Sequence, residues 1–98
     1  MMRKLFGESK MWIIKYEKTA IKQQKIIAHS NYRDKVIELI RIIQNNPFQN
    51  PPPYEKLQPP RNNKYSRRIS KQHRLVYEVI EEENFIKILS MWTHYEAY

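Results

Sequence analysis

Cysteine is absent from this sequence of 98 residues, and glycine occurs once, as Gly7. Without cysteine the chain has no disulfide framework, no thiolate ligand for a metal and no cysteine nucleophile. One glycine cannot build the glycine-rich loop that cradles nucleotide phosphates. No apolar run approaches the roughly 20 residues of a membrane-spanning helix, and the start shows no signal-peptide core. We therefore expect a cytoplasmic protein with no membrane partner.

Histidine is also scarce, and the three histidines lie far apart in the chain: His29, His73 and His94. No HExxH pattern or carboxylate–histidine pair at ligand spacing accompanies them, so we expect no metal ion. Serine catalysis lacks the nucleophile elbow that would expose a reactive serine. The sequence thus predicts no cofactor, and any catalysis would be independent of metals.

Acidic residues are few relative to basic ones, 10 against 18, which gives a formal net charge of +8. This balance favours a polyanionic partner, which could be nucleic acid, an anionic membrane or an acidic protein. A membrane is the least favoured of these, because the lysines are spread over the chain instead of lining one amphipathic helix. The remaining alternative is a basic surface without a partner.

The hydrophobic pattern predicts a single domain over residues 11–98, after a flexible tail over residues 1–10. Strands are predicted over residues 11–16, which are apolar and expected to be well covered, and over 64–70, 73–80 and 85–92. Helices are predicted over residues 19–28 and 32–45, the second with a stripe of Val36, Leu39, Ile40 and Ile43. The order β-α-α-β-β-β indicates an α+β fold. Both helices would pack on one face of a mainly antiparallel sheet, and the other face would be open.

The segment between the second helix and the next strand is rich in proline. Five of the six prolines lie within residues 51–60, so residues 47–63 are expected to form a stiff surface loop. The loop is either a rigid spacer or a ligand for a proline-binding groove. It carries one isolated acid, Glu55, and long loops in compact domains are often functional.

Arginines are set into both strands that follow this loop. Side chains alternate between the two faces of a strand. If Leu75, Tyr77 and Val79 face the core, Arg74 therefore projects from the opposite side. Arg68 can join it there, and together the two arginines would form a pocket for an anion.

These residue types suit a metal-free ribonuclease. RNA carries its own nucleophile, the 2′-OH, so the enzyme supplies a base, a cation for the developing phosphorane charge and an acid for the 5′-oxygen. Glu55, Arg74 with Arg68, and His94 can fill these roles in turn. General acid–base help contributes about 10²–10⁴-fold per group, and fixed cations about as much or more. Residue types alone do not separate this interpretation from a structural one.

A specific sequence pattern supports the ribonuclease interpretation. The strands contain Ser66-Arg67-Arg68-Ile69 and His73-Arg74-Leu75-Val76-Tyr77, preceded by Pro47-Phe48, Glu55 and Leu57 and followed by His94-Tyr95. This pattern resembles that of the YoeB/RelE-type toxins of bacterial type II toxin–antitoxin modules, over almost the whole domain beyond Met11.

The resemblance implies a RelE-like fold of the microbial-ribonuclease type and ribosome-dependent cleavage of mRNA in the A site. The reaction would proceed through a 2′,3′-cyclic phosphate and leave a 5′-OH product. By the same resemblance, Glu55 would be the general base, Arg74 the phosphate-stabilising cation and His94 the general acid. Arg68 would contact phosphate, and Tyr95 would shape the site or stack on a base.

The chain departs from the family pattern at two places. Gln58 stands where the family usually has a lysine, a charge that Lys56 or Arg61 could replace in substrate binding. Asn63 and Tyr65 replace the family's glycine and tryptophan; asparagine tolerates a left-handed turn and tyrosine keeps the aromatic ring.

The resemblance also implies partners: mRNA and the ribosome with its rRNA, and a small acidic antitoxin in a hetero-oligomer. Operator DNA would be bound through the antitoxin complex. One rival is a non-catalytic RNA- or ribosome-binding module on the same fold. Another is a DNA-binding regulator, although no helix-turn-helix signal is present.

Several site residues have alternative interpretations. Glu55 could pair with Lys56 or Arg61 on the surface, and His94 could be a surface histidine. Arg67 is expected to be structural or to face the ribosome.

Overall fold

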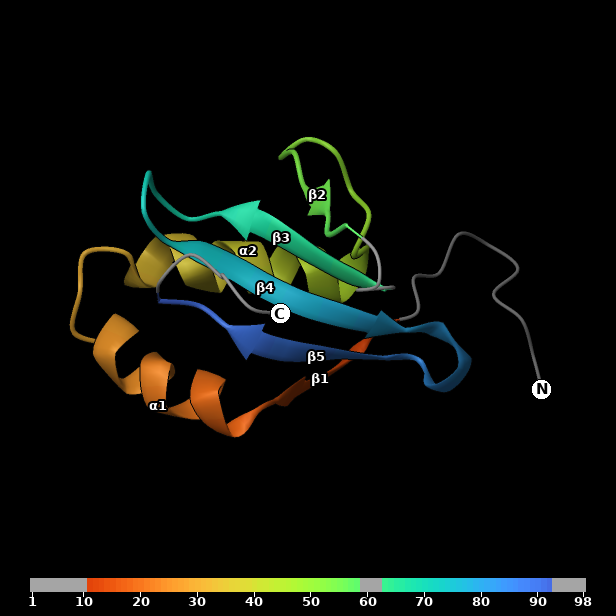
Figure 1. Cartoon of the computed structure of the whole chain (residues 1–98), viewed down its shortest axis with the longest axis horizontal. Helices are drawn as coiled ribbons and strands as arrows, with labels where there is room; N and C mark the ends of the chain where they lie inside the picture. Colours follow the sequence, from red (N-terminus) through yellow and green to blue (C-terminus); the bar gives the residue numbers. More distant parts are fainter. Residues whose placement is uncertain (1–10, 59–62, 93–98) are drawn as a thin grey trace.

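The structure is a computed structural model that describes residues 11–58 and 63–92. Its elements in chain order are β1 (Ile13–Tyr16), α1 (Lys18–Ile27), α2 (Arg33–Asn45), β2 (Glu55–Lys56), β3 (Lys64–Arg68), β4 (Arg74–Ile80), a 3₁₀ turn η1 (Glu81–Glu83) and β5 (Phe85–Ser90) (Figure 1). None of the helices in these ranges has the length and apolar character needed to cross a bilayer.

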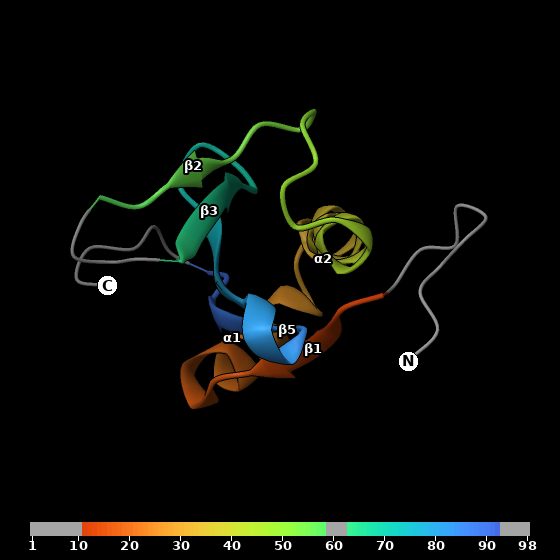
Figure 2. The ribbon, with the colours of Figure 1, turned by 90° about the vertical axis from the view of Figure 1, so that its right-hand side faces the viewer.

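The five strands form one sheet in the order β1-β5-β4-β3-β2. β1 runs parallel to β5, and the other neighbours are antiparallel. Seen from the side, α2 lies against one face of the sheet while β2 forms the far edge (Figure 2). The predicted α+β fold, with two helices packed on a mostly antiparallel sheet, is therefore confirmed.

The core lies between the helices and the sheet. Val36, Leu39 and Ile43 of α2 are buried against the sheet, as their helical spacing predicts. Strands β4 and β5 and helix α1 complete the cluster with Leu75, Tyr77, Val79, Ile86, Ile88, Ala20 and Ile27. The predicted core-facing side of β4 is thus confirmed.

The prediction for the first strand was wrong in one respect. β1 is an edge strand and not a well-covered one, and Ile13 is 56% exposed. Ile14 and Tyr16 pack on the core, so the strand alternates in the ordinary way despite its apolar composition. Its start is tied to the end of α2, where the Trp12 amide donates to the Gln44 carbonyl at 2.9 Å.

The face of the sheet opposite the helices is not open everywhere, contrary to the expectation. A second small cluster lies there, made of Leu57, Val76 and Leu89. Leu57 follows β2, a strand of two residues inside the segment that was predicted to be a loop. A strand this short has no readable alternation, which is why the sequence pattern did not reveal it.

Asn63 adopts the left-handed turn that its replacement of a family glycine suggested, with φ of 67°. Asparagine tolerates this region better than other residues with a Cβ, because its short amide can bond locally. The chain therefore enters β3 in the conformation that the fold requires.

The packing predicts different costs for two substitutions on α2. Leu39 is 1% exposed and Ile37 is 38% exposed. Leu39→Ala should lower the free energy of unfolding by about 2–5 kcal/mol, because it leaves a cavity in the core. Ile37→Ala should cost about 1 kcal/mol or less, because the side chain is partly in water. Urea unfolding followed by circular dichroism measures both, and equal costs would contradict this packing.

Candidate active site

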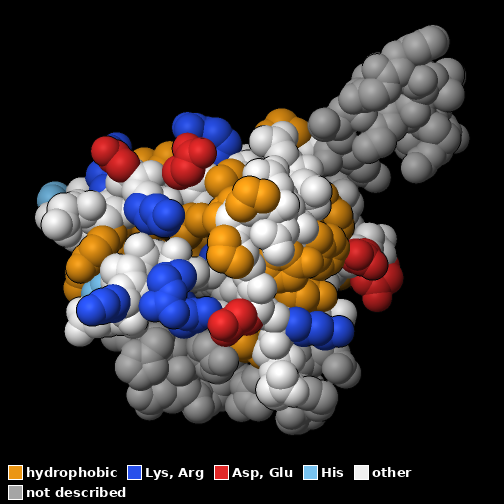
Figure 3. Space-filling view, turned by 90° about the horizontal axis from the view of Figure 1, so that it is seen from above, with side chains coloured by type: hydrophobic (Ala, Val, Ile, Leu, Met, Phe, Trp, Pro, Cys, Tyr) orange, Lys and Arg blue, Asp and Glu red, His pale blue; other side chains and the backbone are white. Residues whose placement is uncertain are grey.

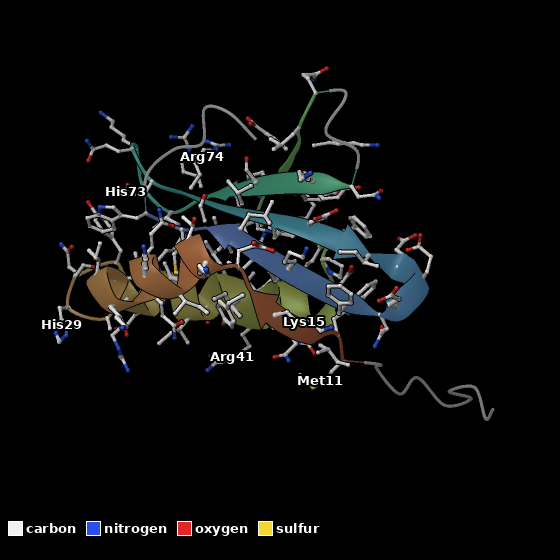
Figure 4. The ribbon with its side chains drawn as sticks, turned by 60° about the horizontal axis from the view of Figure 1, so that its bottom comes forward. Met11, Lys15, His29, Arg41, His73 and Arg74 are labelled. Atoms are coloured by element: carbon white, nitrogen blue, oxygen red, sulfur yellow. The ribbon has the colours of Figure 1, made fainter. Side chains whose placement is uncertain are left out.

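Glu55 and Arg74 meet across strand β3. The register pairs Glu55 of β2 with Ser66 of β3, and Arg74 of β4 with Arg68. The carboxylate Oε1 of Glu55 lies 2.9 Å from Nη2 of Arg74. Nε of the same Arg74 guanidinium donates a hydrogen bond to Oγ of Ser66 at 3.1 Å. Arg74 projects from the sheet on the side away from α2 (Figure 4).

The two partners differ in their access to solvent. The Glu55 side chain is 66% exposed, whereas the Arg74 side chain is 14% exposed. Within residues 11–58 and 63–92, the contacts of Arg74 use Nε and Nη2, and none uses Nη1. The guanidinium is thus held in one orientation by Ser66 and Glu55 while it keeps donors for an anion.

Arg68 adds a second positive charge to this face. It is exposed, and its Cα is the cross-strand partner of the Arg74 Cα, so the two side chains share one face of the sheet. This confirms the prediction that Arg68 and Arg74 lie together. Seen from above, the molecule shows several basic side chains and a few acidic ones beside a hydrophobic area (Figure 3). Such a surface suits a phosphate-bearing ligand.

The other predicted site residues are placed differently. Lys56 is exposed and pairs with Tyr65, so it lies on the opposite side of the strand from Glu55. His94, Tyr95 and Arg61 lie outside the described residues.

Arg67 was expected to be structural or to face the ribosome, and the structural alternative is confirmed. Its side chain is fully buried on the core side of β3. It donates hydrogen bonds to the Tyr77 hydroxyl and to backbone carbonyls of the proline-rich loop: Pro47, Gln49 and Pro52. Burial raises the pKa of Tyr77 to about 12, although the neighbouring Arg67 acts in the opposite direction.

Of the two described histidines, His73 directly precedes Arg74 in the chain, but its ring packs on aromatic residues elsewhere. The His73 ring stacks on Trp92 at 4.2 Å and meets the edge of Tyr32 at 5.1 Å. His29 is exposed at the far end of α1 (Figure 4). Over residues 11–58 and 63–92, no group of His, Cys, Asp and Glu side chains could hold a metal ion.

Ser66 is a site residue that the sequence reasoning missed. Its hydroxyl is buried and accepts from Nε of Arg74, which orients the guanidinium toward Glu55. The sequence contained a signal for this role, because side-chain alternation places Ser66 on the same face of β3 as Arg68 and opposite to Arg67. What the sequence lacked was the register between β3 and β4.

The comparisons with known proteins identify the family and the fold. A family model described as "YoeB-like toxin of bacterial type II toxin-antitoxin system" matches residues 15–95. The chain is 34% identical to a chain of the YoeB–YefM complex from Staphylococcus aureus, with a TM-score of 0.71, covering 88% of this chain and 100% of the other.

Two more distant structures share the fold. The YoeB/ParE toxin from Agrobacterium tumefaciens is 22% identical with a TM-score of 0.77, covering 85% of this chain and 99% of that one. A chain of the E. coli RelBE toxin–antitoxin complex is 20% identical with a TM-score of 0.70, covering 87% and 99%. Comparison with curated protein sequences gives no significant match. The family match over most of the chain and the YoeB identity together show that this chain belongs to the YoeB-like toxins of bacterial type II toxin–antitoxin systems.

Proposed function

We propose that this chain is a ribosome-dependent mRNA endoribonuclease that works without a metal and is neutralised by a cognate antitoxin. The observation that carries the proposal is the Glu55–Arg74 pair, with 2.9 Å between carboxylate and guanidinium at an accessible edge of the sheet. A base and a phosphate-binding cation at this spacing can serve two atoms of the same RNA linkage.

The proposed reaction is the one that the family resemblance implies. Glu55 accepts the proton of a 2′-OH, whose oxygen attacks the adjacent phosphorus. The bond between phosphorus and the 2′-oxygen forms as the bond to the 5′-oxygen breaks. Arg74 donates to the non-bridging oxygens, where negative charge grows. His94 gives a proton to the departing 5′-oxygen, leaving a 2′,3′-cyclic phosphate and a 5′-OH.

The rate enhancement would be shared among these groups. General acid–base catalysis contributes about 10²–10⁴-fold per group, and a fixed cation at the phosphoryl oxygens about the same or more. Arg74 suits the second role because Ser66 and Glu55 hold it before the substrate arrives, so little reorganisation is needed during the reaction.

The remaining residues would bind substrate. Arg68 would contact phosphate beside Arg74, and Tyr95 would stack on a base. Lys56 would contact a phosphate outside the cleaved linkage, because it lies on the other side of β2 from Glu55. Arg61 would also bind substrate.

Charge determines the proposed partners. The net charge of +8 would attract the protein to rRNA and mRNA in the ribosome. The same charge favours a small acidic antitoxin that covers the active face in a hetero-oligomer. Related structures include the YoeB–YefM complex from Staphylococcus aureus and the RelBE toxin–antitoxin complex from E. coli. Operator DNA would be bound through the antitoxin, and action on ribosomes requires a cytoplasmic location.

Primer extension on an mRNA in translating ribosomes tests the activity. The wild-type protein should create new 5′ ends within codons, and Arg74→Ala should lower their yield by about 10²-fold or more, because the phosphate charge loses its fixed cation. Arg41→Ala is the matched control: Arg41 is an exposed arginine of α2 whose side chain is 66% exposed. The control should cleave like the wild type.

The other outcomes are equally informative. Cleavage of free mRNA at the same rate would keep the nuclease and remove the ribosome from the mechanism. Ribosome binding without cleavage by the wild-type protein would overturn the catalytic proposal in favour of a non-catalytic binding module.

The salt dependence of ribosome binding tests the role of Arg68. In the Glu55→Gln background, which should bind without rapid cleavage, log K should fall linearly with log salt concentration. Arg68→Ala should reduce this slope by about one, because one phosphate contact is lost. Arg33→Ala, at an exposed position of α2, should leave the slope unchanged. Equal slopes for Arg68→Ala and its parent would contradict a phosphate contact.

A further inference from the structure

Arg67 is a buried cation that has no acidic partner among the described residues. Its side chain is 0% exposed, and none of the ion pairs formed within residues 11–58 and 63–92 includes it. A buried charge is costly unless hydrogen bonds replace its water. The groups that accept hydrogen bonds from Arg67 therefore show what its buried charge does in the fold.

Those groups come mostly from one segment, the proline-rich loop of residues 47–54. Nη2 of Arg67 donates to the carbonyls of Pro47 at 3.0 Å and Gln49 at 2.9 Å, and Nη1 donates to that of Pro52 at 2.6 Å. Three carbonyls spaced along the loop thus converge on one planar guanidinium. Only arginine offers donors in this fixed fork.

Tyr77 strengthens the same attachment from β4. Its hydroxyl accepts from Nε of Arg67 at 3.0 Å and donates to the Pro47 carbonyl at 2.9 Å. Burial raises the pKa of Tyr77 to about 12, so the hydroxyl keeps its proton and its donor role at neutral pH. The loop start is therefore bonded to two side chains of the sheet.

The end of the loop is fixed by Tyr54, the residue directly before Glu55. Its ring centroid lies 5.0 Å from Cζ of Arg67, within the range of a cation–π contact. The ring also meets Tyr65 of β3, with 5.8 Å between centroids. These contacts hold the backbone at the point where the loop enters β2.

The strand that carries Glu55, β2, is very short and makes few backbone contacts of its own. The strand has two residues, and the Glu55 side chain is 66% exposed. After the strand, the Leu57 amide donates to the Lys64 carbonyl at 2.9 Å. Before it, the described support is the loop that Arg67 binds.

We propose that Arg67 is a positioning residue for Glu55: its guanidinium holds the loop of residues 47–54 on the core side of β3 and so keeps the Glu55 carboxylate beside Arg74. Arg67 does not touch RNA, since it is completely buried, and it acts through the carboxylate alone. This inference rests on the proposed function, in which Glu55 is the base.

Arg67→Lys tests the inference, because lysine keeps the charge but not the planar fork. The single-turnover cleavage rate on programmed ribosomes should fall about a hundredfold, the size of loss expected when a catalytic group is displaced by about 1 Å. Ribosome affinity should stay the same. In a double-mutant cycle, Arg67→Lys should cause no further loss on the Glu55→Gln background. Arg33→Lys, at an exposed position of α2, should leave all three measurements unchanged.

Hydrogen–deuterium exchange provides a readout that does not need activity. Arg67→Lys should speed exchange at the backbone amides of residues 48–50 and 54–57, which flank the prolines, and leave α2 protected. Tyr77→Phe, which removes the hydroxyl but keeps the buried ring, should show the same pattern more weakly and serves if Arg67→Lys fails to fold.

Either of two kinetic results would overturn the inference: a folded Arg67→Lys protein that cleaves at the wild-type rate, or an equal loss of rate on the Glu55→Gln background. Exchange that rises over the whole chain and not in the loop would also overturn it, because Arg67 would then be a general core residue. A wild-type protein that cleaves nothing refutes the proposed function, and the loop exchange still decides whether Arg67 holds the loop.

Discussion

The alternation of side chains along β3 is the constraint on which the site depends. Consecutive residues of a strand point to opposite faces, so Ser66 and Arg67 serve different sides of the sheet. Ser66 accepts from Arg74 on the face away from the helices. Arg67, on the core side, binds the loop that leads to Glu55. One strand therefore locates both members of the Glu55–Arg74 pair.

The two arginines illustrate how burial and hydrogen bonding assign different roles to the same residue type. Arg67 is completely buried, and its Nε, Nη1 and Nη2 make four hydrogen bonds within the fold. Arg74 is 14% exposed and held at two of its nitrogens. An arginine that is partly exposed and held at two nitrogens can bind phosphate, whereas a fully buried one that is bonded at all three nitrogens stabilises the fold.

Much of the fold and of the site could be predicted from the sequence. The remaining features could not be predicted, and the reasons are physical. Helical spacing identified the buried side of α2, and alternation identified Leu75, Tyr77 and Val79 as core residues. The family string pointed to Glu55 and Arg74. The approach of these two residues depends on β2, which is too short to show a period, and on contacts between Arg67 and backbone carbonyls, which have no sequence signature. The edge position of β1 was missed because apolar composition does not distinguish an edge strand from a central one.

The central claim is that Glu55 and Arg74 promote attack by the 2′-OH, and the ends of the cleaved RNA test it most directly. An mRNA cleaved in programmed ribosomes should carry a 2′,3′-cyclic phosphate on the upstream fragment and a 5′-OH on the downstream one. A single 2′-deoxy nucleotide at the cleavage position should abolish cleavage there. A 5′-phosphate on the downstream fragment, or undiminished cleavage of the 2′-deoxy substrate, would contradict the account.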